Sequence, residues 1–129
     1  MSVLHGFLYP KREEKREFYL SGRFQGENGE PLLWEIRPIS AEEDLGLRQS
    51  VETGSGMDYR RYLLKLAAFS TVTPDLKSEE LQDAYSAYGE EELLSRMLLP
   101  GELARLIEQV EDINGFTEPM EELVDQAKK

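Results

Sequence analysis

The 129-residue chain contains no cysteine and a single histidine, His5. The lack of cysteine excludes disulfide bonds and thiolate metal sites. A serine-histidine-acid triad would have to use His5, which falls in the N-terminal arm. No D-x-D-x-D-G loop gathers carboxylates for a metal ion. We therefore expect a protein that is not an enzyme, with no catalytic residues, no cofactor and no metal site.

Long apolar runs are also missing. No segment approaches the ~20 apolar residues that a membrane-spanning helix requires. Residues 3–9 are largely apolar, but this run is short and has no basic stretch ahead of it. It is therefore a poor match to a signal peptide. We expect a cytoplasmic protein without a membrane partner.

Basic side chains are scarce in the second part of the chain. Residues 1–77 contain 12 acids and 11 bases, a net charge of −1, whereas residues 78–129 contain 14 acids and 4 bases, a net charge of −10. Such an acidic surface repels nucleic-acid phosphates and anionic lipids, so nucleic acid is not an expected partner. The acids are either the solvated faces of amphipathic helices or a surface that attracts a basic partner.

Residues 58–76 form the stretch around which we expect the chain to fold. Its apolar residues recur at the three- and four-residue spacing of a helix and cover most of the circumference, with Leu66 in the middle of the stripe. Such a helix must be covered on several sides. Asp58 is the predicted N-cap, and Pro74 is predicted to end the helix.

Strand periodicity precedes this helix. Residues 18–24 and 32–38 alternate between apolar and polar side chains, and Asn28-Gly29 lies in the turn between them. A β-hairpin is therefore predicted, and it must pack its Trp34 face on helices or extend a sheet with another chain. Residues 52–57 (ETGSGM) are predicted to be a flexible loop.

Further amphipathic helices are predicted around the central one. Ser40 and Glu43 form a capping box before the first of these helices, and Gly89 is the predicted αL cap of the second. The predicted helices span residues 41–51, 78–88, 90–99, 100–114 and 119–128, and residues 2–9 are either a short helix or an extended arm. The fold class is α+β. We predict a mostly α-helical single domain with an N-terminal arm and charged connector (1–16), a β-hairpin (17–38) and a helical region (40–128).

The candidate partner-binding surface lies on the last two predicted helices, 100–114 and 119–128. Each carries one apolar stripe, and only a few residues separate them. The terminal helix could cover a groove for a partner helix and move aside when that partner arrives. The alternative is that it completes the core. The candidate residues are Leu103, Leu106, Ile107, Val110, Met120, Leu123 and Val124.

Three segments carry a family resemblance: LLWEIRPISAEED (32–44), YLLKLAAFSTVTPDLKSEELQDAYSAYG (62–89) and EELLSRMLLPGELARLIEQVEDINGF (91–116). In this order they resemble the XkdN-like tail assembly chaperones of PBSX-like prophages and related tailed phages. The resemblance implies a non-enzymatic protein that works in the host bacterial cytoplasm. Its implied partner is the phage tape-measure protein, which such chaperones keep soluble until tube subunits polymerise around it. The tail tube protein is a second candidate partner, and a homo-oligomer is compatible with the sequence.

A second hypothesis is a structural tail or baseplate component that remains in the virion. A chaperone would be absent from purified particles, whereas a structural component would be present at a fixed copy number. Many phages also extend such chaperones by a ribosomal frameshift.

Overall fold

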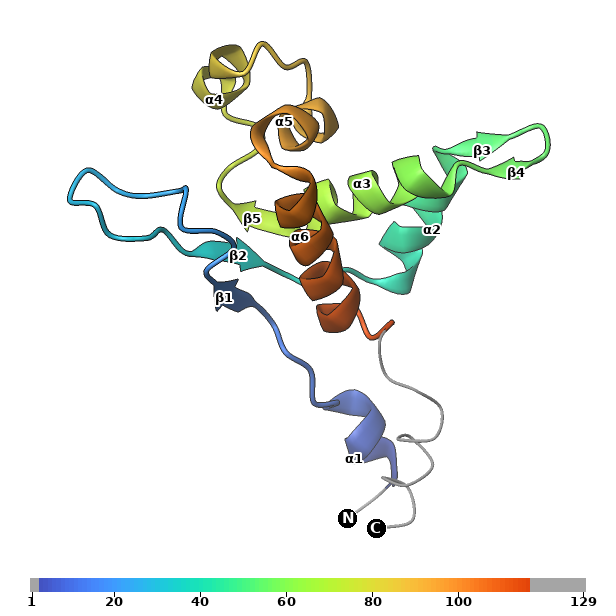
Figure 1. The fold of residues 1–129 in the computed structure, drawn as a ribbon. Coiled ribbons are helices and arrows are strands. Elements are labelled where there is room, and N and C mark those ends of the chain that lie inside the picture. The colour runs from blue at the N-terminus through green and yellow to red at the C-terminus, as the bar shows by residue number, and fades with distance from the viewer. Residues whose placement is uncertain (1–2, 117–129) are drawn as a thin grey trace.

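The computed structural model describes residues 3–116, which form helices and small antiparallel sheets (Figure 1). The predicted α+β class, with mostly helical content, is confirmed. The predicted helix at residues 119–128 lies outside the described residues. In chain order the elements are α1 (Val3–Leu8), β1 (Arg16–Phe18), β2 (Trp34–Ile36), α2 (Ala41–Gln49), β3 (Glu52–Thr53), β4 (Gly56–Met57), α3 (Tyr59–Ser70), β5 (Thr71–Thr73), α4 (Glu79–Ala84), α5 (Glu90–Met97) and α6 (Pro100–Ile113).

Helix α3 lies at the centre, as predicted. The Asp58 carboxylate accepts a hydrogen bond from the Arg61 N–H at 3.2 Å, so Asp58 is the N-cap. Helices α2, α5 and α6 all pack against α3, and α6 crosses it in Figure 1. Leu66 is 1% exposed and Ala67 is fully buried. The broad apolar face is covered on several sides, as its sequence requires.

The end of α3 differs from the prediction. The helix stops at Ser70, four residues before Pro74, and Thr71–Thr73 form strand β5. The β-branched residues Thr71, Val72 and Thr73 favour extended backbone, and a residue before proline is pushed in the same direction. The Thr71 hydroxyl donates to the Ala67 carbonyl at 2.7 Å, which satisfies one of the last carbonyls of the helix. Strand β5 therefore replaces the expected last turn of α3.

The sheet has three strands in the order β1-β2-β5, all antiparallel. The predicted pairing of the hairpin is present, with Phe18 opposite Trp34, but the predicted bounds of 18–24 and 32–38 are wrong. Between β1 and β2 the chain forms a long loop. The two arms of this loop pair at an isolated β-bridge between Gln25 and Pro31. Gly29 turns this loop with a φ of +81°, a conformation that suits glycine. Strand β5 supplies the partner that a lone hairpin lacks.

Two further local predictions are corrected. Residues 52–57 are not a loop but the hairpin β3-β4, closed at its base by the Asp58 N–H, which donates to the Val51 carbonyl at 3.0 Å. Gly56, the first residue of β4 after the turn, adopts a φ of +147°. Helix α4 ends at Ala84, and Gly89 precedes α5 instead of capping α4. The turn after α4 instead uses Ser86, whose φ is +53°.

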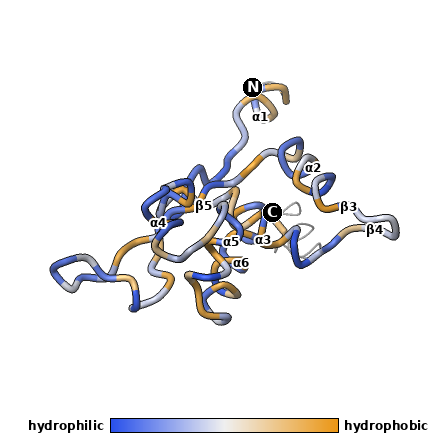
Figure 2. The backbone as a smooth tube through the Cα atoms, turned by 90° about the horizontal axis from the view of Figure 1, so that it is seen from above, coloured by the Kyte–Doolittle hydropathy of each residue, from blue (hydrophilic) through white to orange (hydrophobic). Residues whose placement is uncertain are grey.

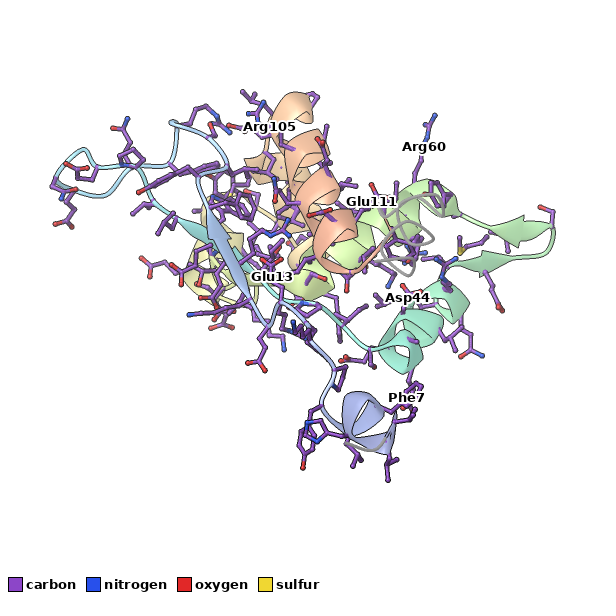
Figure 3. The ribbon with its side chains drawn as sticks, turned by 90° about the horizontal axis from the view of Figure 1, so that it is seen from below. Phe7, Glu13, Asp44, Arg60, Arg105 and Glu111 are labelled. Atoms are coloured by element: carbon purple, nitrogen blue, oxygen red, sulfur yellow. The ribbon has the colours of Figure 1, made fainter. Side chains whose placement is uncertain are left out.

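Helix α1 lies apart from the other elements. Figures 1 and 3 show it beyond the charged connector, with Phe7 labelled in Figure 3. None of its residues is buried, and Phe7 is 79% exposed. Of the two forms predicted for residues 2–9, the helix is the one observed. Among the described residues, no helix is long and apolar enough to cross a membrane.

Candidate protein-binding site

Within residues 3–116, no cluster of three or more histidine, cysteine, aspartate or glutamate residues is arranged to hold a metal ion. His5 lies on α1, where its ring is 4.9 Å from that of Tyr9. The surface features that stand out in the described part of the chain are instead apolar and acidic. They suit protein recognition.

Only part of the predicted partner-binding surface on α6 is accessible to a partner. Leu106 is fully buried and Val110 is 1% exposed, so both belong to the core. Leu103 and Ile107 are half-buried and pack against that core. The other candidates, Met120, Leu123 and Val124, lie outside the described residues.

A different apolar surface lies between the β1-β2 loop and α4. We call it the apolar groove. It is a hollow of about 260 Å³ lined by Phe24, Leu32, Leu33, Trp34, Thr73, Pro74, Leu81, Tyr85 and Met97. Leu32 and Leu33 are 48% and 41% exposed, whereas Trp34 is buried at the floor. In Figure 2 the base of this loop is hydrophobic and its tip is hydrophilic. An apolar side chain of a partner could therefore reach the groove from solvent.

The loop wall of the groove is held by its own contacts. Phe24 and Trp34 meet edge to face, with ring centroids 5.5 Å apart. The Leu32 N–H donates to the Phe24 carbonyl at 2.8 Å, and the Gly26 N–H donates to the Glu30 carbonyl at 2.8 Å. These contacts keep the loop in a defined shape, so this wall is formed before a partner binds.

An ion pair fixes the same loop to the helices. The Arg23 Nε donates to the Glu102 carboxylate at 2.8 Å, and the Arg23 Nη2 donates to the Met97 carbonyl at 3.0 Å. Glu102 also accepts from the Leu99 N–H at 2.7 Å, at the start of α6. The hydrogen bonds from Arg23 lower the pKa of Glu102 to about 2, against the opposing effect of desolvation. Glu102 is therefore a charged anchor that holds Arg23, the residue before Phe24 in the groove wall.

Acidic side chains border the groove on the α4 side. A neighbouring hollow is lined by Asp75, Ser78, Glu80, Leu81 and Ala84, and Leu81 lines both hollows. Asp75 and Glu80 are exposed, and neither forms an ion pair with another described residue. The groove thus combines an apolar lining with a negatively charged border.

Sequence patterns did not reveal this groove, because its residues come from segments far apart in the chain. The sequence feature that points to an exposed apolar surface here is the adjacent pair Leu32 and Leu33. In a strand with alternating faces, two successive leucines place one of them on the outer face. Here both leucines lie just before β2, which begins at Trp34, and both are partly exposed.

Comparison with known proteins places the chain among phage proteins. The family model described as "Phage XkdN-like tail assembly chaperone protein, TAC" matches residues 4–128. The phage-like element PBSX protein XkdN of Bacillus subtilis (strain 168) is 30% identical over 119 residues, covering 84% of this chain and 80% of XkdN. The uncharacterized protein YqbN of the same strain is 30% identical over 125 residues, covering 89% and 84%. A crystal structure of YqbN superposes with a TM-score of 0.76 at 27% identity, covering 85% of this chain and 94% of YqbN.

Proposed function

The chain belongs to the phage XkdN-like tail assembly chaperone family, and from this membership we propose that it binds the tape-measure protein during tail assembly. The observation that carries the proposal is the family match across residues 4–128. In this role the protein is not an enzyme and works in the cytoplasm of the host bacterium. It holds the tape-measure protein in a soluble form until the tail tube assembles around it.

The physical properties of the chain support this role. A chaperone for a long apolar helix needs exposed apolar surface to hold the helix and net charge to keep the complex in solution. The apolar groove supplies the first requirement. The net charge of −11 supplies the second, and it also disfavours nucleic acid as a partner.

Co-expression tests the proposal. The tape-measure protein of the same phage is produced alone, with this chain, and with an unrelated acidic protein of similar size. We expect soluble tape-measure protein to accumulate, and to co-purify, only with this chain. Equal solubility with the acidic control, or no co-purification, would contradict the proposal.

Purified phage particles separate this role from that of a structural tail or baseplate component. We expect the chain to be absent from particles but present in lysates during assembly. Detection at a fixed copy number in particles would favour the structural role.

A further inference from the structure

We propose that the apolar groove binds an amphipathic helix of the tape-measure protein. A large apolar side chain of that helix would insert between Leu33 and Leu81, and lysine or arginine on its flank would face α4. This inference rests on the proposed function and assigns the contact to one place on the chain.

The lining of the groove suits insertion of an apolar side chain. In the hollow of about 260 Å³, Thr73 and Tyr85 are the lining residues with hydroxyl groups that could orient a ligand. The lining is almost entirely apolar, and Trp34 and Met97 at the base are buried. Binding hot spots are apolar pockets of this kind, which one anchor residue fills.

The β5 edge of the sheet, which adjoins the groove, does not suit the main alternative, addition of a partner strand. Strand β5, at the edge, has only three residues. It is followed by Pro74, which has no N–H to continue a ladder of hydrogen bonds. A partner that approaches this face therefore finds side-chain contacts in the groove instead of a long backbone edge.

The charges beside the groove indicate that the partner helix carries basic side chains next to its apolar anchor. Helix α4 carries Glu79, Glu80 and Asp83 and no basic residue. Arg23, next to the groove wall, is paired with Glu102, and Lys77 is the one base among residues 75–84, against Asp75, Glu79, Glu80 and Asp83. Opposite charge on the partner would complement this border and speed its association.

Substitution of an exposed lining residue tests the groove. Leu33→Asn in the full chain removes one apolar wall, and Leu45→Asn is the matched control, since Leu45 is 63% exposed on α2. Loss of a central anchor contact is expected to weaken binding of the tape-measure protein about tenfold or more. The control should bind as the unaltered chain does. Equal affinities for the two variants would overturn the groove assignment.

Glu80→Gln tests the charged border, with Glu42→Gln in the first turn of α2 as its control. We expect a slower association rate for Glu80→Gln and a weaker dependence of that rate on salt, because one steering charge is lost. An association rate unchanged from that of the control would overturn the requirement for a basic flank.

Crosslinking distinguishes loss of the groove contact from a folding defect in the variants. A photo-crosslinking amino acid is placed at position 33, and at position 45 as the control. Crosslinks from position 33 are expected on an apolar helical segment of the tape-measure protein next to lysine or arginine. If the unaltered chain does not bind that protein at all, the proposed function fails. If it binds, but position 33 gives no crosslink and Leu33→Asn has no effect, the groove inference alone fails.

Discussion

Arg23 and Glu102, which are 79 positions apart in the sequence, form an ion pair beside the apolar groove, where Arg23 also donates to the carbonyl of the lining residue Met97. The Glu102 side chain is 3% exposed, whereas that of Arg23 is 45% exposed. Glu102 lies in the first turn of α6, and Arg23 lies next to Phe24, which forms part of the groove wall. The pair therefore couples the position of the β1-β2 loop to the helical core.

We expect Glu102→Gln to lower the free energy of unfolding at neutral pH and to reduce its dependence on acid. In the folded chain the pKa of Glu102 is lowered from its ordinary value of 4.5 to about 2, chiefly by Arg23. A lowered folded-state pKa contributes stability that is complete above pH 4.5 and is lost as the pH falls toward 2. Urea denaturation across this window measures the effect. Glu108→Gln, an exposed change on the same helix, should keep the acid dependence of the unaltered chain.

Leu66→Ala should destabilise the domain by about 2–5 kcal/mol, because it removes a buried side chain and leaves a cavity in the core. Leu66 is 1% exposed on α3. Leu64→Ala, on the same helix, should cost less, because Leu64 is only half-buried. Chemical denaturation of both variants provides the comparison. Equal small losses would show that α3 is not the centre of the core.

Tyr62→Phe should cost about 1 kcal/mol, because the Tyr62 hydroxyl connects two helices. The hydroxyl donates to Asp44 and accepts from Arg48 at 3.1 Å, so it joins α3 to α2. Burial, with Asp44 as a second cause, raises the pKa of Tyr62 to about 12. The corresponding stability is complete below pH 10.0 and is lost as the pH rises toward 12.

Thermal unfolding of Tyr62→Phe between neutral and alkaline pH measures both effects. Tyr59→Phe is the control, because Tyr59 is 54% exposed. If both variants lost the same stability, the hydrogen bonds of Tyr62 would not be the cause.

Truncation after Phe116 tests the two roles predicted for residues 119–128, since loss of a cover over a partner surface should leave a folded chain, whereas loss of part of the core should unfold it. Circular dichroism and urea denaturation check the fold. Tighter binding of the tape-measure protein by the truncated chain would support the hypothesis that residues 119–128 cover a partner surface. Unfolding would instead show that this segment completes the core.

The local signals in the sequence determined where most helices begin. Ser40 and Asp58 each accept a hydrogen bond from the first turn of the following helix, and Pro100 begins α6, as predicted. Ser78 caps α4 in the same way. These features depend on residues three or four positions apart, so their chemistry can be seen in a short stretch of sequence. The stripe on α3 likewise showed that this helix had to be enclosed.

Tertiary structure decided the features that depend on distant segments. The β-branched residues Thr71–Thr73 favour extended backbone, but they become a strand because β2 pairs with them. The loop from residue 19 to residue 33 is held in place by contacts with α5 and α6. The burial of Leu106 and Val110, on a stripe expected to bind a partner, depends on how α6 crosses α3. The groove, too, exists only where the β1-β2 loop meets α4. Residue spacing reports the side of a helix or strand on which an apolar residue lies, but only the packing of the folded chain determines whether that side is covered.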